Sequence, residues 1–198
     1  MKQYFEDLWA ALPDALEPPY FEVRQRFLLD EVTAGVRTLD LGCGEGVFTA
    51  VLARAGADVV GADVAETALA RAERAHPGLR FMLVSDVGPL PFADGGFELV
   101  WASEVIEHVA DTARWLSEVR RVLAPGGRLL LTTPQHGRLA VAVHGLERYS
   151  EPLGDHLHLY TRRSLRTLLS EFGFAEIELR AAVGLPPLRR LLLARATT

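Results

Sequence analysis

The sequence predicts a single α/β domain built around a parallel β-sheet. Short apolar runs that fit strands alternate along the chain with longer runs whose apolar residues recur at helical spacing. A glycine-rich turn at 42–46 joins the first of these strands to the helix that follows it. Strands that alternate with helices favour parallel pairing with right-handed crossovers. The length of 198 residues suits one domain, so 1–198 is treated as one unit.

The first half of the chain supplies two leading helices and then strands in regular alternation. Phe5, Leu8 and Trp9 share a helical face before Pro13, and a second helix is expected after Pro18-Pro19. The strands expected next are 36–41, 58–62, 79–84, 97–102 and 128–133, with helices at 47–55 and 65–75 between the first three.

The second half continues this alternation. Asp111 and Thr161 stand where helix N-caps are needed, ahead of two apolar stripes of helical spacing. The elements expected are a helix from Asp111 to the stop at 125–127, a helix from Thr161 to Gly173, a sixth strand around 177–179 and a seventh at 188–196. The chain thus divides into N-terminal helices (1–34), a cofactor-binding half (35–133), a substrate loop or lid (134–160) and the rest of the sheet (161–198).

Composition argues against several classes of protein. The single cysteine, Cys43, excludes an intrachain disulfide and a cysteine-built zinc site. A net charge of −5 disfavours a broad phosphate-binding surface, so no nucleic-acid partner is expected. The apolar runs are too short for a bilayer, and the acidic N-terminus lacks the features of an export signal. We therefore expect a cytoplasmic protein without a membrane partner.

The glycine turn predicts a ligand site at the end of the first strand. Gly42, Gly44 and Gly46 allow the backbone to approach a ligand closely, and the following helix offers free N–H groups. Their spacing, G-x-G-x-G, differs from the G-x-G-x-x-G of dinucleotide-binding folds. A phosphate-binding P-loop is excluded because no G-K-[ST] follows.

Acidic residues follow the next two strands and extend this site. Asp63, 21 residues after Gly42, can accept hydrogen bonds from both hydroxyls of a ribose. Asp86 can receive an adenine amino group, and Val87 offers an apolar face to the ring. Each of Asp40, Asp63 and Asp86 could instead cap a turn or helix. Their joint placement at successive strand ends favours a ligand, since ligands of open parallel sheets bind there.

Four segments in this order and spacing resemble a known family: LDLGCGEG, GADV, SDVGPLPFADGGFELVWASEVIEHV and RRVLAPGGRLLLTTP. The chain resembles class I S-adenosylmethionine-dependent methyltransferases of small-molecule type, such as ubiquinone-pathway O-methyltransferases, over roughly residues 25–180. The resemblance implies a three-layer Rossmann-like sandwich with a seven-stranded, mostly parallel sheet in order 3-2-1-4-5-7-6. It also implies S-adenosyl-L-methionine as cofactor and S-adenosyl-L-homocysteine as product. The cofactor residues assigned with it are Asp40, Gly42, Gly44 and Gly46 for the methionine portion, Asp63 with Val64 for the ribose, Asp86 with Val87 for the adenine, and Ser103.

The segment SEVIEHV after the fourth strand carries the candidates for chemistry. An alcohol or phenol acceptor must lose a proton, which requires a base or a metal. His108 is the expected general base because a histidine ordinarily titrates near neutral pH, and Glu104 is the second catalytic candidate. On a helical turn Glu104, Glu107 and His108 would face one side.

A divalent cation is the alternative at this segment. E-x-x-E-H with later histidines resembles metal-dependent 2′-O-methyltransferases that act on small-RNA 3′ ends, and the same pattern recurs in ubiquinone-pathway enzymes. His156 or His158 would then complete the ligand set. Glu104 could equally be a cap, Glu107 solvated and His108 a structural hydrogen bonder. No residue is assigned as a metal ligand.

The predicted function is methyl transfer to a small-molecule acceptor, with oxygen as the expected acceptor atom. The alternatives are a metal-dependent RNA 2′-O-methyltransferase and a catalytically silent S-adenosylmethionine-binding partner subunit. The acceptor pocket is expected between the N-terminal helices and the loop, walled by Tyr4, Phe5, Trp9, Tyr149, His156 and Tyr160. Packing on an amphipathic helix face is the favoured explanation for Phe5 and Trp9. The acceptor and the oligomeric state are left open.

Overall fold

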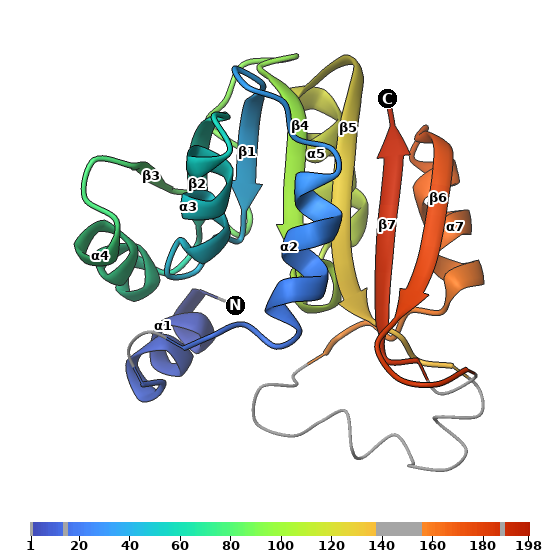
Figure 1. Cartoon of the computed structure of the whole chain (residues 1–198), viewed down its shortest axis with the longest axis horizontal. Coiled ribbons are helices and arrows are strands. Elements are labelled where there is room, and N and C mark those ends of the chain that lie inside the picture. Colours follow the sequence, from blue (N-terminus) through green and yellow to red (C-terminus); the bar gives the residue numbers. More distant parts are fainter. Residues whose placement is uncertain (1, 14–15, 138–155, 187–188) are drawn as a thin grey trace.

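The computed structural model describes residues 2–13, 16–137, 156–186 and 189–198. Its centre is a seven-stranded sheet in the order β3-β2-β1-β4-β5-β7-β6. β7 is antiparallel to both β5 and β6, while the other neighbours pair in parallel (Figure 1). The predicted α/β class and strand order are confirmed.

The strands are β1 (Arg37–Leu41), β2 (Asp58–Asp63), β3 (Arg80–Leu83), β4 (Phe97–Ser103), β5 (Leu123–Pro134), β6 (Ala175–Ala182) and β7 (Leu191–Thr197). The helices are α1 (Lys2–Ala11), α2 (Phe21–Leu29), α3 (Val47–Arg54), α4 (Glu66–Ala75), α5 (Thr112–Val122) and α7 (Arg162–Glu171), with a short 3₁₀ helix η1 (Ile106–His108). Among the helices described here, none is long and apolar enough to cross a bilayer.

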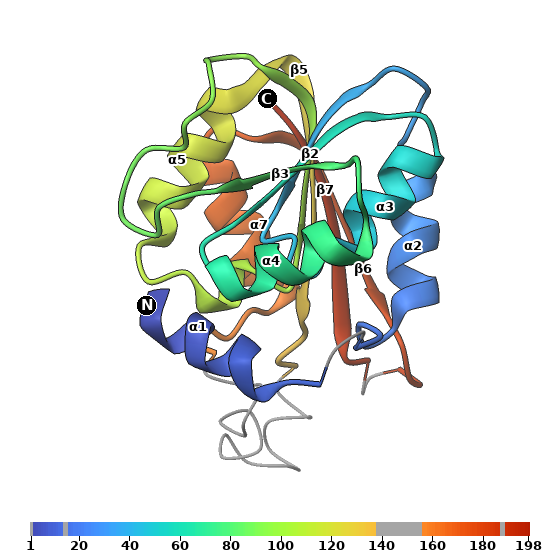
Figure 2. The same ribbon diagram turned by 90° about the vertical axis from the view of Figure 1, so that its left-hand side faces the viewer.

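Helices cover both faces of the sheet, as the edge-on view in Figure 2 shows. α2 and α3 pack on one face, where the Trp101 ring lies 5.2 Å from the Phe48 ring and 6.2 Å from the Phe27 ring. α5 and α7 pack on the other face through the buried Leu116 and Leu165. Each such fully buried large side chain stabilises the fold by roughly 1.5–3 kcal/mol. The two apolar layers therefore hold the sheet rigid beneath the site.

The two predicted N-caps are confirmed. The Asp111 carboxylate accepts from the Arg114 backbone N–H at 3.0 Å and begins α5. Thr161 begins α7 with a reciprocal capping box: its hydroxyl accepts from the Ser164 N–H at 3.1 Å, and the Ser164 hydroxyl accepts from the Thr161 N–H at 2.9 Å.

Several element boundaries differ from the prediction, with β5 beginning at Leu123 rather than at 128. α5 ends at Val122 rather than at Pro125-Gly126-Gly127, because Leu123 already pairs with Phe97 as the start of β5. The register then shifts before Arg128, so the Pro-Gly-Gly segment lies in an irregular part of the strand. β7 begins at Leu191 rather than 188. Most of the predicted lid, including His144 and Tyr149, and also Leu188 lie outside the described residues.

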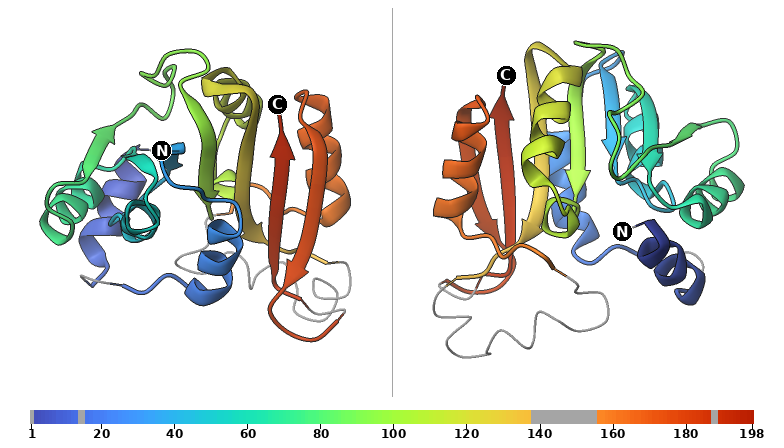
Figure 3. Two further views of the ribbon diagram at one scale, coloured as in Figure 1. Left: turned by 45° about the horizontal axis from the view of Figure 1, so that its top comes forward. Right: turned by 180° about the vertical axis from the view of Figure 1, so that it is seen from behind.

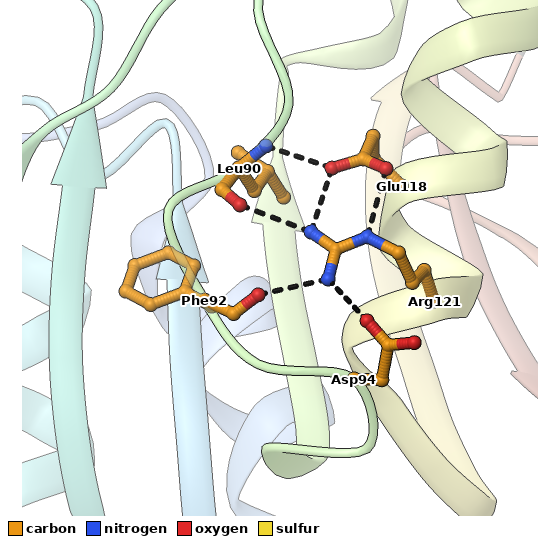
Figure 4. A network of polar contacts seen from close by, with 5 residues as sticks. All are labelled: Leu90, Phe92, Asp94, Glu118 and Arg121. Carbon is orange, nitrogen blue, oxygen red and sulfur yellow. Dashed lines mark hydrogen bonds and ion pairs between the residues drawn. The ribbon is translucent and has the colours of Figure 1, made fainter.

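Arg121 of α5 fastens the loop that precedes β4, as Figure 4 shows. Its Nη1 donates to the Phe92 carbonyl at 2.8 Å and to Asp94 at 2.7 Å, and its Nη2 donates to the Leu90 carbonyl at 3.0 Å. Glu118 accepts from Arg121 Nε at 2.9 Å and from the Leu90 N–H at 2.7 Å. The same loop carries Asp86 and Val87, so this network limits where the adenine candidates can lie.

Replacement of Arg121 by alanine is expected to lower the free energy of unfolding by about 2 kcal/mol, because charge-assisted bonds to partly buried carbonyls are lost. Urea denaturation followed by circular dichroism measures this change. Arg120→Ala is the control, since Arg120 is exposed on the same helix and should cost less than about 0.5 kcal/mol. Equal losses in the two variants would contradict the role given to Arg121.

Candidate functional site

The predicted cofactor residues gather at one edge of the sheet. Parallel pairing brings the carboxyl ends of β1 to β4 to this edge, and α1 lies beside them (Figure 1 and the right-hand view of Figure 3). This edge carries the glycine turn after β1, Asp63 at the end of β2, Asp86 after β3 and the 103–108 segment from the end of β4.

The glycine turn has a backbone that only glycine adopts without strain. Gly42, Gly44 and Gly46 have φ values of 78°, 52° and 78°. A Cβ on Gly42 would lie 2.4 Å from the Val105 side chain, and one on Gly44 would lie 2.8 Å from the Trp9 ring. The turn is therefore a cradle of bare backbone, with α3 beginning directly after it.

Asp63 holds this turn in place. One carboxylate oxygen accepts from the Gly44 N–H at 2.8 Å and the other from the Ala65 N–H at 3.0 Å. Burial raises the pKa of Asp63, while these hydrogen bonds oppose the rise. Each carboxylate oxygen keeps a further lone pair, so the group can still accept from ribose hydroxyls.

Asp40 lies beneath the turn and is almost wholly buried. Its carboxylate accepts from the Thr49 hydroxyl at 2.6 Å, which joins β1 to α3. Burial raises the pKa of Asp40 to about 7. The hydrogen bond from Thr49 shows that Asp40 stabilises the junction of β1 and α3. Binding of a ligand by Asp40 stays a prediction.

The remaining cofactor candidates differ in their exposure. Val87 is 69% exposed, and Asp86 is also exposed, although its carboxylate accepts from the Lys2 backbone N–H at 3.0 Å. Val64 is half-buried beside Asp63. Ser103 lies within 2.9 Å of the Thr132 hydroxyl, oxygen to oxygen.

Glu104 does not lie on a helical turn with Glu107 and His108, so that part of the prediction is wrong. It has a positive φ of 56° and precedes η1. Its carboxylate accepts from the Thr132 hydroxyl at 2.8 Å and lies 3.3 Å from the guanidinium of Arg24. The left-handed residue turns the chain between β4 and η1, so Glu104 is not part of the helical turn that carries Glu107 and His108. Burial raises the pKa of Glu104, and Arg24 opposes this.

Glu107 and two histidines form a compact group. Ligand atoms of Glu107, His108 and His156 all lie within 4.8 Å of one another. Glu107 is fully buried: one oxygen accepts from the Thr133 hydroxyl at 3.0 Å, and the other has no hydrogen bond within the part of the chain that the structure describes. Burial and the nearby Glu104 raise its pKa well above the ordinary value. The His158 ring instead lies 2.9 Å from the Val109 carbonyl, so His156 is the histidine brought to the group.

Aromatic rings adjoin His108. The Phe5 ring of α1 meets the His108 ring edge-on with centroids 6.0 Å apart, and the His156 ring lies 5.0 Å away. No residue of α1 is buried, so its apolar face contributes little to the core and Phe5 faces the site instead. Tyr160, by contrast, is buried in the main core.

The segment that carries the cofactor candidates is similar in sequence to known proteins. The family described as "Methyltransferase domain" matches residues 39–131. The ubiquinone biosynthesis O-methyltransferase of Cereibacter sphaeroides is 38% identical over 118 residues, which are 57% of this chain and 48% of that protein. The demethylmenaquinone methyltransferase of Beutenbergia cavernae is 41% identical over 109 residues, 54% of this chain and 45% of that protein. This chain belongs to the class I S-adenosylmethionine-dependent methyltransferases.

Several solved structures have the same fold as this methyltransferase. An S-adenosylmethionine-dependent methyltransferase from Mesorhizobium loti superposes with a TM-score of 0.70 at 24% identity, covering 90% of this chain and 97% of that one. One from Archaeoglobus fulgidus gives 0.74 at 14% identity, covering 89% and 92%. The chain spans less than half the length of the two curated relatives described above.

The edge of this methyltransferase fits S-adenosylmethionine. A Cβ at Gly42 would meet Val105 and one at Gly44 would meet Trp9, so only bare backbone fits at the turn. Asp63 is oriented by two backbone N–H groups and retains acceptor capacity for a ribose. Exposed Val87 offers an apolar surface to a flat base. These features suit a nucleoside ligand.

Two residues near this site were missed by the sequence analysis. Arg24 is buried on α2, and its place three and four residues before the buried Phe27 and Leu28 could have shown that it shares their face. His136 is buried after β5, with its ring 5.9 Å from the His156 ring, and burial lowers its pKa. It lies in the aperiodic 134–160 segment, where the sequence offers no comparable signal.

Proposed function

We propose that this protein binds S-adenosylmethionine at the carboxyl ends of β1 to β4 and transfers its methyl group to a small-molecule hydroxyl. The observation that carries the proposal is the placement of Asp63 and the bare glycine turn beside the His108 segment on one sheet edge. Two relatives, a demethylmenaquinone methyltransferase and a ubiquinone biosynthesis O-methyltransferase, support a small-molecule acceptor. We also propose a cytoplasmic location and no nucleic-acid partner.

Each part of the edge takes one portion of the cofactor in this proposal. The turn at Gly42 to Gly46 holds the methionine portion, Asp63 with Val64 holds the ribose, and Asp86 with Val87 holds the adenine. The bound cofactor supplies an electrophilic methyl group on a sulfonium, and S-adenosylhomocysteine is the product. The protein aligns the acceptor and excludes water.

His108 is the proposed base. Its imidazole takes the proton from the acceptor hydroxyl as the oxygen gains the methyl group, so the proton that leaves the acceptor stays on His108. Glu107 lies close enough to stabilise the resulting imidazolium. In the free protein the Phe5 ring of α1 lies edge-on against the His108 ring.

A combined binding and turnover experiment tests this function. Calorimetry should detect binding of S-adenosylmethionine and S-adenosylhomocysteine, and a screen of phenols, carboxylates and amines should release S-adenosylhomocysteine with at least one phenol. Lack of heat with both nucleosides would contradict the cofactor site. Binding without transfer to any acceptor would favour a catalytically silent partner subunit.

The Glu107, His108 and His156 group favours a second candidate mechanism in which a divalent cation polarises the acceptor oxygen. One carboxylate oxygen and two imidazole nitrogens within 4.8 Å suit such an ion, and the buried oxygen of Glu107 gains a partner. This is the mechanism that would accompany RNA 2′-O-methylation, for which a gel shift with small RNA is the test.

Metal removal separates the two mechanisms. If His108 is the base, dialysis against EDTA should leave kcat within about twofold, since proton transfer then needs no ion. Elemental analysis of the untreated protein is the control for tightly bound metal. A loss of activity that Mg²⁺, Mn²⁺ or Zn²⁺ restores would assign the three residues to a metal site instead.

A further inference from the structure

α1 lies across the edge that the proposed function assigns to the cofactor. Its position beneath the strand ends is visible in Figure 1 and in the right-hand view of Figure 3. Contacts from this one helix reach the glycine turn, the segment after Asp63, Asp86 and His108. The glycine turn and Asp86 are positions proposed for the cofactor, and the other two contacts flank them.

Glu6 attaches α1 to the N-terminus of α4. Its two carboxylate oxygens accept from the backbone N–H groups of Glu66 at 2.7 Å and Thr67 at 3.0 Å, in the first turn of α4. Free N–H groups at a helix N-terminus bind carboxylates well. These hydrogen bonds hold the pKa of Glu6 below its ordinary value. α4 starts directly after the Asp63 segment, so Glu6 lies next to the proposed ribose acceptor.

Two further contacts of α1 cover ligand positions directly. The Trp9 ring rests on the glycine turn, within 2.8 Å of where a Cβ of Gly44 would lie. The backbone N–H of Lys2 donates to the Asp86 carboxylate at 3.0 Å, which is the group proposed for the adenine. The indole therefore lies where the methionine portion would approach, and Asp86 is engaged with the helix.

α1 is nevertheless held loosely. None of its residues is buried, so it gains little from the hydrophobic core, and exposed polar contacts supply much of its attachment. Segments with few buried apolar contacts open at low free-energy cost. A ligand that binds the same edge can therefore displace the helix.

We propose that α1 is a gate over the cofactor site: in the free protein Glu6 fastens the helix to α4 and Trp9 covers the glycine turn, and the helix must leave before S-adenosylmethionine enters. The inference rests on the proposed cofactor site. It predicts that the measured dissociation constant equals the intrinsic one divided by the fraction of open molecules. Weakening the attachment of α1 should then strengthen binding, which is the reverse of what a helix that clamps the bound cofactor would show.

Stopped-flow and calorimetric binding of S-adenosylhomocysteine to full-length Glu6→Ala tests the gate. We expect association to become on the order of tenfold faster and the dissociation constant to fall by a similar factor, because two charge-assisted hydrogen bonds of the closed state are lost. Asp7→Ala is the matched control, since Asp7 is exposed on the same helix and accepts only from Gln3 among the contacts described. Its association rate should equal that of the wild type.

Hydrogen exchange of the 2–11 amides provides a readout that needs no turnover. Under the gate, saturating S-adenosylhomocysteine makes these amides exchange faster in the wild type. Slower exchange with ligand, or weaker or unchanged binding by Glu6→Ala, would overturn the gate while leaving the cofactor site intact. Absence of binding in the wild type and in Glu6→Ala, with unchanged circular dichroism, would overturn the cofactor site and the gate together.

Discussion

Replacement of His108 by glutamine is expected to lower kcat on the order of 100-fold or more, which is the usual contribution of a general base. The affinity for S-adenosylmethionine should stay within about twofold, because His108 lies at the acceptor side, against Phe5 and His156. Initial rates with the acceptor found in the screen, together with calorimetry of the cofactor, measure both quantities.

His158→Gln is the matched control for this prediction. The His158 ring lies 2.9 Å from the Val109 carbonyl, and a glutamine amide can also donate to that oxygen, so kcat should change less than about threefold. In His108→Gln the limb of the pH–rate profile that reports deprotonation of the base should vanish. Equal loss of turnover and of cofactor affinity would show that His108 is structural.

Replacement of Asp63 by asparagine is expected to weaken cofactor binding on the order of 100-fold. Asparagine keeps the shape but presents one NH₂ group, so either the Gly44 or the Ala65 N–H loses its acceptor and the ribose loses a charged partner. Stability should change by only about 1 kcal/mol, because the lost hydrogen bond is offset by removal of a buried charge whose pKa is raised in the folded state. Calorimetry and urea denaturation separate the two effects.

Asp58→Asn controls for the change of charge on the same strand. Asp58 begins β2 at the opposite end, where it is exposed and forms an ion pair with Arg80. Cofactor affinity should be unchanged in this variant, and a surface ion pair adds less than about 1 kcal/mol to stability. Wild-type affinity in Asp63→Asn would contradict the assignment of Asp63 to the ribose.

The sequence by itself determined the α/β class and placed the cofactor candidates at one edge of the sheet, while the strand order rested on the resemblance to the family. Local signals suffice for the elements: apolar periodicity distinguishes strands from helices, Asp111 and Thr161 supply side chains that cap helices, and the glycines permit positive φ. Strand alternation then requires neighbouring strand ends to meet, which brings the glycine turn to Asp63.

Only the tertiary structure decided the acceptor side. One left-handed residue keeps Glu104 out of the helical turn of Glu107 and His108, and its pairing with Arg24 joins elements 80 residues apart in the sequence. The choice of His156 over His158 likewise depends on how the 156–160 segment packs against η1. The position of α1 over the cofactor edge is set by Glu6 on the first turn of α4, an exposed contact. Such contacts arise from packing between distant segments, and no local propensity encodes them.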